Sequence, residues 1–374
     1  MATLELVCLK GFPVPVILFP MKNINTMISK KSLTAISKKH KTFCKMKNEE
    51  SLAKLLKKPL YKLRLIGMHP GYHVFSVNKK NSDKKRWIED PEPPLKAIQQ
   101  QLNDYLQAVY TVYRSPAAYG FMMSFPRDNE PRNILTNAEK HLGNPWLVNM
   151  DAKDFFHSVR EKRVFKMFTK APFKFEYGLA HLLTQLTTHM GRLPMGAPTS
   201  PVISNFACRK LDKELLQLSD WAGWTYTRFA DDMTFSSKKR ISKTDVLQIK
   251  KIIQKQNFTL NPDKVQFFEL EDRKLVTGLV LKEKKVGVPE KFYKKLLHDI
   301  LKLKHVMEVQ VQLGKARSSW AEKFQKSVAG RINFVLFITG EATTKAQELL
   351  AKYDDAVNPR HDLEPVSWMD FPYF

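Results

Sequence analysis

The stretch Trp224–Ser237, WTYTRFADDMTFSS, decides the fold of this chain of 374 residues. Its β-branched and aromatic residues recur with a period of two on both sides of Ala230-Asp231-Asp232, which predicts two strands joined by a tight hairpin. Adjacent carboxylates at a hairpin tip are costly unless a cation neutralises them, and Mg2+ prefers carboxylate oxygens and substrate phosphates. Taken alone, the stretch fits a solvated Asp-Asp turn at least as well.

The composition indicates a polyanionic partner. Lys and Arg number 62 against 37 Asp and Glu, which gives a net charge of +25. Nucleic acid and an anionic membrane surface both attract such a charge. No apolar run approaches the roughly 20 residues of a membrane span, so we expect nucleic acid and no membrane. The cysteines Cys8, Cys44 and Cys208 are scattered, which indicates neither a zinc site nor disulfides and is typical of a cytoplasmic protein.

Several motifs along the chain carry candidate chemistry. A short apolar strand, residues 146–150, is followed by Asp151, which fits either a metal ligand or a helix cap. Residues 191–201 form a Gly/Pro-rich loop, after which Ser200 is the expected N-cap of a helix with Pro201 at its first position. Asn137 and His141 share one face of a short helix, and a structural role is favoured for them over catalysis.

Two basic elements are candidates for contact with phosphates. Residues 72–77 and 84–88 predict a hairpin with a basic turn, for which a solvated loop is an equally good interpretation. A helix beginning after Pro289 has an apolar stripe flanked by lysines, which suits a nucleic-acid backbone better than a membrane surface. Before them, residues 1–47 form a basic N-terminal extension that we interpret as neither a signal peptide nor a membrane span.

Taken in order, these motifs resemble those of reverse transcriptases. VNMDAKDFF around Asp151 matches the first catalytic block, MGAPTSPVISN the second, FADD the third and NFTLNPDK the fourth. Phe229 stands where Tyr is usual, and Met195 where Gln is common. The Asn-Ala-x-x-His element at Asn137 and the Val-Thr-Gly element at Val276 are similar to those of retron reverse transcriptases in particular.

The resemblance implies an α+β right-hand polymerase. It would comprise fingers (48–136), a palm with an antiparallel sheet (137–280, with helices near 160–190 inserted) and a helical thumb with a tail (281–374). The implied enzyme is an RNA-directed DNA polymerase that takes deoxynucleotides and binds two Mg2+ ions about 4 Å apart. The implied metal ligands are the carboxylates of Asp151, Asp231 and Asp232 and the main chain of Ala152.

The resemblance also implies contacts with nucleotide and RNA. Phe156 matches the ring that crowds a ribose 2′-hydroxyl, and the other residues expected near the nucleotide are Lys80, Arg86, Ala197 and Lys264. Structured RNA would be bound by shape and phosphate contacts. The residues expected there are Asn137, His141, Val276, Thr277, Gly278, Lys291, Lys294 and Lys295.

The implied biology is that of a retron. A cognate noncoding RNA would serve as template and primer, a 2′-hydroxyl would start synthesis, and the product would be branched msDNA. The system would act against phage through a separate effector protein. Two alternatives stay open: a group II intron or diversity-generating reverse transcriptase, and a non-catalytic RNA-binding scaffold with a polymerase fold.

Overall fold

The computed structural model describes residues 5–9, 12–16, 30–78, 85–123, 128–312 and 318–358. It divides into two compact units: the larger spans Asn23–Thr277, and the smaller combines Met1–Lys22 with Gly278–Phe374. Within the described ranges, no helix combines the length and the apolar character that crossing a bilayer requires.

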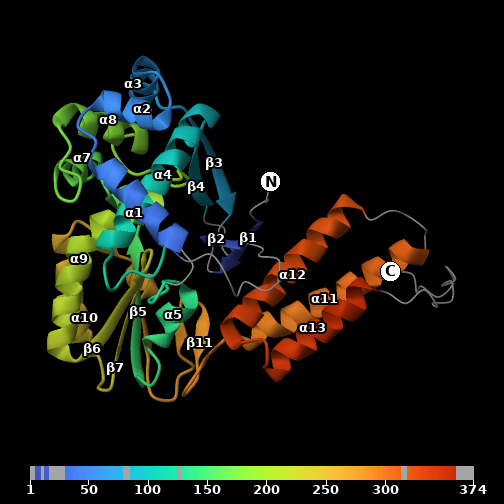
Figure 1. Cartoon of the computed structure of the whole chain (residues 1–374). Coiled ribbons are helices and arrows are strands. Elements are labelled where there is room, and N and C mark those ends of the chain that lie inside the picture. The colour runs from blue at the N-terminus through green and yellow to red at the C-terminus, as the bar shows by residue number, and fades with distance from the viewer. Residues whose placement is uncertain are drawn as a thin grey trace. The chain divides into compact units, whose positions relative to one another are not determined.

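The larger unit is built around an antiparallel sheet with the strand order β6-β7-β5-β8, and β9 also pairs with β5 (Figure 1). Strand β7 pairs with β5 on one side and β6 on the other, and nearly all of it is buried. A strand that is buried on both faces needs apolar or fully hydrogen-bonded side chains, which Met233, Thr234 and Phe235 supply. The strands are β5 (Trp146–Lys153), β6 (Trp224–Phe229), β7 (Asp232–Ser237), β8 (Thr259–Leu260) and β9 (Gln266–Phe268).

Two long helices lie along one side of this sheet (Figure 1): α9 packs on β6, and α10 packs on α9 and β8. Apolar residues at helical spacing bury their faces, among them Ile203, Leu211 and Leu215 of α9. Gly223 ends α9 in the left-handed conformation, with φ +70°, and β6 begins at the next residue. The bounds of these two helices are α9 (Ser200–Ala222) and α10 (Lys243–Lys255).

The rest of the larger unit shares one hydrophobic core with the sheet, from Leu52 and Leu63 through Leu102 and Phe168 to Phe235. Its remaining elements are α1 (Lys30–Cys44), α2 (Glu49–Leu56), α3 (Leu60–Met68), the antiparallel hairpin of β3 (Tyr72–Asn78) and β4 (Lys85–Pro91), α4 (Pro93–Tyr113), α5 (Ile134–Glu139), α6 (Phe155–Ser158), α7 (Glu161–Thr169), α8 (Tyr177–Thr187), η1 (Pro262–Lys264) and β10 (Leu275–Val276). Because the core is continuous, the sheet and the helices around it form one scaffold.

The smaller unit has a core of its own, formed by three helices. Its apolar stripe on α11 includes Leu296, Ile300 and Leu303, which pack with Val335 of α12 and Leu349 of α13. Its elements are the antiparallel pair β1 (Glu5–Leu9) and β2 (Phe12–Val16), the antiparallel pair β11 (Leu279–Leu281) and β12 (Val286–Gly287), and the helices α11 (Glu290–Gln312), α12 (Ser319–Thr339) and α13 (Thr344–Val357).

Most elements expected from the sequence are present, with two corrections. The N-cap of α9 is Thr199 rather than Ser200, whose hydroxyl instead donates to the Pro194 carbonyl at 2.7 Å. The pattern of residues 275–282 predicts a single strand turned at Gly278. The structure instead has two strands, β10 and β11, because Thr277 (φ +48°) and Gly278 (φ +86°) both adopt left-handed backbone. The sequence patterns did not predict α1, α13, β1, β2, β8 or β12.

Candidate active site

Asp151 of β5 and Asp232 of β7 are direct partners in the antiparallel register of the two strands. Cα atoms of such partners lie about 4.5–5.5 Å apart, so two carboxylates that are distant in sequence occupy neighbouring positions. The expectation that Asp151 follows the end of its strand is wrong, because β5 continues to Lys153 and there pairs with β8. Asp151 thus lies inside a paired strand, which fixes its backbone.

Asp231 lies in the two-residue turn between β6 and β7. The turn begins at Ala230, whose φ of +59° is the left-handed value that tight hairpins demand at this place. The Asp231 carbonyl accepts a hydrogen bond from the Ala152 amide at 3.0 Å, which ties the turn to β5. The predicted hairpin is confirmed, although Asp232 is the first residue of β7 and not part of the tip.

The electrostatics of Asp231 reflect two neighbouring anions. The residue is 9% exposed, and its Oδ1 atom is buried with no hydrogen-bond partner among the described residues. Burial, followed by the negative charges of Asp232 and Asp151, raises the pKa of Asp231 well above its ordinary value of 3.8. Carboxylates that share a site behave in this way until a cation joins them. The three aspartates therefore form one electrostatic cluster.

Lys264 supplies a positive charge to this cluster. Its Nζ atom lies 2.6 Å from Asp151 Oδ2, and its side chain is 55% exposed. It stands on η1, whose preceding residue, Asn261, donates its amide to the Asp151 carbonyl at 2.9 Å. An exposed lysine is a mobile point charge on a flexible stem, so it can partner either the carboxylate or a phosphate brought next to it.

The donor set suits a hard divalent cation. Within the described part of the chain, no three His, Cys, Asp or Glu side chains already stand as a metal ligand set. The unpartnered Oδ1 of Asp231 and its raised pKa are nonetheless what a carboxylate cluster with affinity for such a cation would display.

Phe156 lies five residues after Asp151, in the first turn of α6 (Phe155–Ser158). It is 7% exposed, and its ring packs against Phe155 at 5.5 Å and Phe121 at 5.8 Å between centroids. Phe121 is in turn held by a hydrogen bond of 3.0 Å from Gln107 Nε2 to its carbonyl. The ring predicted to face the ribose therefore has firm support on one side. Its role in sugar selection stays a prediction.

The other residues predicted near the nucleotide have varied surroundings. Arg86 is half-buried on β4, in register with Val77 of β3. Ala197 is buried in the loop before α9. The preceding residue, Gly196, packs so closely on β4 that an added Cβ would lie 2.9 Å from the Glu89 carbonyl. Lys80 lies outside the described residues.

Asn137 and His141, predicted to bind RNA, are both fully buried in this conformation. His141 bonds Ser236 Oγ and Thr227 Oγ1, each at 2.7 Å, and burial lowers its pKa to about 3. Asn137 donates to Thr277 Oγ1 at 3.5 Å. Asn137 thus ties α5 to residue 277. His141 lies beyond the end of α5 rather than on it, contrary to the prediction, and ties that segment to β6 and β7. Any effect on RNA would pass through those contacts, and direct RNA contact stays a prediction.

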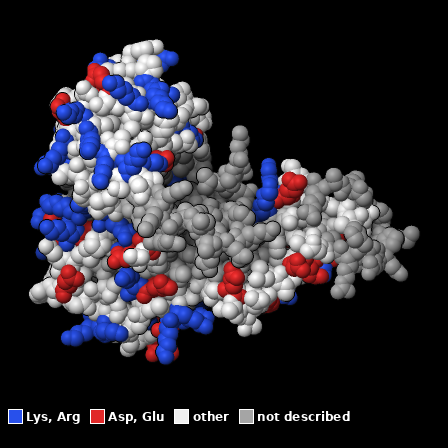
Figure 2. Space-filling view, viewed as in Figure 1, with Lys and Arg blue, Asp and Glu red and all other residues white. Residues whose placement is uncertain are grey.

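The remaining predicted RNA-binding residues lie at the end of the larger unit and in the smaller unit. Val276 and Thr277 are buried, and Gly278 adopts a left-handed backbone. Exposed side chains on α11 belong to Lys291, Lys294 and Lys295. On the face of the larger unit that Figure 2 shows, Lys and Arg side chains form scattered groups among uncharged residues.

Sequence reasoning missed two buried charged groups. Glu89 of β4 is 3% exposed and accepts from His157 at 3.0 Å, from Arg192 at 3.1 Å and from the Met195 amide at 3.1 Å. It thereby joins the β3–β4 hairpin to the Gly/Pro-rich loop. Arg228 and Asp212 form the second group. For Arg228 the available signal was a charged residue among the β-branched and aromatic residues of β6, because a charge that is buried in a strand requires a partner.

Comparison with known proteins agrees with this geometry. Residues 77–317 match the sequence family described as reverse transcriptase (RNA-dependent DNA polymerase). The chain belongs to the reverse transcriptase family. This membership and the antiparallel sheet with its helices confirm the predicted fold class.

Individual relatives show to which group of reverse transcriptases the chain belongs. The chain is 34% identical to the retron Mx162 reverse transcriptase of Myxococcus xanthus over 266 residues, which cover 62% of this chain and 53% of that protein. It is 32% identical to the retron Ec86 reverse transcriptase of Escherichia coli over 230 residues, which cover 60% of this chain and 68% of that protein. Within its family the chain belongs with the retron reverse transcriptases. The match spans about half of the Myxococcus protein's length.

A solved structure gives a weaker likeness. Telomerase from Candida albicans in complex with a TWJ fragment of telomeric RNA aligns with a TM-score of 0.42 at 10% identity, covering 78% of this chain and 64% of that one. A likeness of this degree carries no argument about function.

Proposed function

We propose that this protein is an RNA-directed DNA polymerase that copies a cognate structured RNA into DNA. The observation that supports the proposal is the convergence of Asp151, Asp231 and Asp232 on one hairpin and its partner strand. Family membership supports the same reaction. In this interpretation the larger unit carries the fingers (48–136) and most of the palm (137–280), and the helices of the smaller unit serve as the thumb (281–374).

Two Mg2+ ions would be held by the carboxylates of Asp151, Asp231 and Asp232, with the Ala152 carbonyl as a further ligand. When bound, such ions lower the pKa of the primer hydroxyl and neutralise charge on the leaving pyrophosphate. The chain's own residues would orient the reactants. Lys264 would turn from Asp151 toward the phosphates of an incoming deoxynucleotide, assisted by Lys80 and Arg86 from the β3–β4 hairpin, beside Ala197.

The names of its relatives support a retron role. We infer that a cognate noncoding RNA is both template and primer, that a 2′-hydroxyl of this RNA begins synthesis, and that the product is branched msDNA. The exposed lysines of α11 would bind the RNA through phosphates. The protein would work in the cytoplasm with a separate effector protein in defence against phage.

Nucleic acid that copurifies with the protein tests this proposal. We expect DNA of defined length that stays joined to a ribonucleotide after ribonuclease digestion. The Asp231→Asn variant, purified in parallel, should carry the same RNA without the DNA. Intron RNA in place of a short structured RNA would contradict the retron role, and identical nucleic acid in both preparations would contradict the polymerase assignment.

A further inference from the structure

Arg228 and Asp212 form an ion pair in the interior of the larger unit. Their side chains are 1% and 0% exposed, and the guanidinium of Arg228 on β6 contacts the Asp212 carboxylate of α9 twice, Nε to Oδ1 at 2.7 Å and Nη2 to Oδ2 at 2.8 Å. Tyr226 also donates to Asp212, at 3.1 Å. A hydrophobic pair of similar volume is often at least as stabilising as a buried ion pair, so its presence calls for a further reason.

The contacts of the third guanidinium nitrogen, Nη1, supply that reason. Arg228 Nη1 donates to the Ala230 carbonyl at 3.0 Å and to Asn205 Oδ1 at 3.1 Å. Ala230 is the residue before Asp231, and its φ of +59° is one that side chains other than glycine seldom adopt. The guanidinium therefore holds the turn in its unusual conformation through the Ala230 carbonyl.

The same turn is held by a second backbone segment. Asn205 Nδ2 donates to the Gly120 carbonyl at 2.9 Å, and a Cβ added at Gly120 would lie only 2.5 Å from the Ala230 nitrogen. Along β6, the Arg228 amide donates to the Ala117 carbonyl at 2.7 Å. Only glycine allows this close approach, so the segment and the turn interlock backbone to backbone.

We propose that Arg228, held by Asp212, is a positioning residue for the catalytic turn. By fixing the Ala230 carbonyl it sets the direction in which the next residue, Asp231, presents its carboxylate. This inference rests on the proposed polymerase function. A role in stability alone would predict that any well-packed replacement of the pair keeps full activity, whereas a positioning role predicts a folded but slow enzyme.

The test is the charge-free double variant Arg228→Met/Asp212→Leu, which fills the space without leaving a buried charge. It should fold and bind RNA as the wild type does, with kcat for deoxynucleotide incorporation lowered about 10²-fold, the cost typical of small misplacements at an active site. The KM for the deoxynucleotide should stay nearly unchanged, and more Mg2+ should be needed for half-maximal rate.

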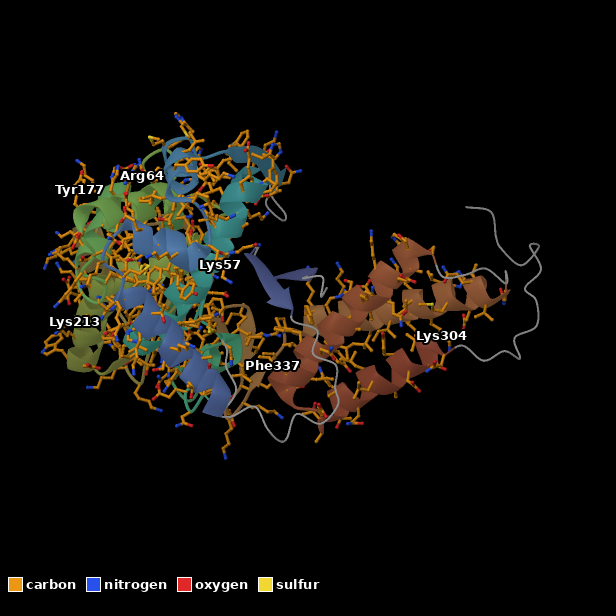
Figure 3. The ribbon with its side chains drawn as sticks, turned by 45° about the horizontal axis from the view of Figure 1, so that its top comes forward. Lys57, Arg64, Tyr177, Lys213, Lys304 and Phe337 are labelled. Atoms are coloured by element: carbon orange, nitrogen blue, oxygen red, sulfur yellow. The ribbon has the colours of Figure 1, made fainter. Side chains whose placement is uncertain are left out.

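Two matched variants control for the loss of charge. Arg331→Met/Asp299→Leu removes an ion pair of 2.5 Å, with side chains 15% and 13% exposed, from the helices of the smaller unit, far along the chain from the turn. Lys213→Gln changes the residue that follows Asp212. The side chain of Lys213 is exposed and points outward from α9 (Figure 3). Both should keep the wild-type kcat.

Arg228→Lys covers the case in which the double variant does not fold. It keeps the charge, but one ammonium cannot hold Asp212 and the Ala230 carbonyl in the geometry of the planar fork, so the same fall in kcat is expected with RNA binding retained. Wild-type kcat in either folded variant would overturn the positioning role. A wild-type protein without any incorporation would instead overturn the proposed function.

Discussion

Asp151 and Asp232 face each other across β5 and β7, although four helices and a strand, α6 to α9 and β6, lie between them along the chain. Strand register, not local sequence, produces this meeting. With Asp231 in the adjoining turn, it brings three carboxylates into one electrostatic cluster, in which the buried Oδ1 of Asp231 has no partner among the described residues. The expected consequences concern stability, sugar selection and RNA binding as well as catalysis.

The carboxylate cluster should destabilise the protein when no divalent cation is present. Folding raises the pKa of Asp231 above 3.8, so the folded state loses stability as the pH rises from that value through the raised pKa. In EDTA at neutral pH, Asp231→Asn should therefore raise the Tm, by roughly 2–4 °C for each 1 kcal/mol of repulsion relieved.

Magnesium should reverse this difference. Added Mg2+ should raise the Tm of the wild type through binding to the folded state and should affect Asp231→Asn much less. Thermal scans in EDTA and in Mg2+ measure both effects. A wild type that is more stable than the variant in EDTA, or indifferent to Mg2+, would count against a shared carboxylate site.

His141 should make the fold sensitive to acid. Burial lowers its pKa from 6.5 to about 3, so the stability that the neutral imidazole contributes is complete above 6.5 and is lost as the pH falls toward 3. Below pH 6.5 the free energy of unfolding should fall by up to about 1.4 kcal/mol per pH unit, which is the free energy that corresponds to one pKa unit. Denaturant titrations at pH 7 and 5.5 should show a smaller acid loss in His141→Gln, and equal losses would contradict the assignment.

Phe156 should determine discrimination against ribonucleotides, with Phe121 supporting it. Phe156→Ala should raise ribonucleotide relative to deoxynucleotide incorporation by about 10- to 100-fold, and Phe121→Ala by less, since it only loosens the ring. Phe165→Ala is the control, because that ring packs on Tyr177 instead. Competition assays measure the ratio. If Phe121→Ala matched the control, Phe121 would have no part in sugar selection.

The lysines of α11 should bind RNA through counterion release. Replacing Lys291, Lys294 and Lys295 by Gln should reduce the salt slope of RNA affinity by about 2–3, close to one unit for each phosphate that a lysine no longer neutralises. A matched triple variant at three exposed lysines of α10, Lys243, Lys250 and Lys251, removes the same charge. Equal slopes in the two triple variants would mean that net charge, and not α11, governs binding.

The sequence predicted the parts of this site whose signal is local. Period-two residues flank Asp231 and a short apolar run precedes Asp151, and these patterns indicated the strands on which the aspartates lie. That the strands are neighbours followed only from the resemblance of the ordered motifs, because register between distant strands leaves no local trace.

The contacts that the sequence did not predict are long-range side-chain pairings. Strand alternation placed Arg228 on one face of β6, but nothing in the chain identifies Asp212, on another element, as its partner. The left-handed backbone of Thr277 was also hidden, since threonine rarely adopts it. Likewise, Asn137 and His141 were recognisable as a pair, but their burial against Thr277 and Ser236 depends on tertiary packing.

The most direct measurement is deoxynucleotide incorporation on a primed RNA template with Mg2+, comparing the wild type with Asp151→Asn and Asp231→Asn. Loss of metal ligation should remove several kcal/mol of transition-state stabilisation, so each variant should fall about 10³-fold with RNA affinity retained. Asp220→Asn, at an exposed aspartate of α9, should match the wild type. Incorporation by Asp151→Asn and Asp231→Asn at the wild-type rate would contradict the account.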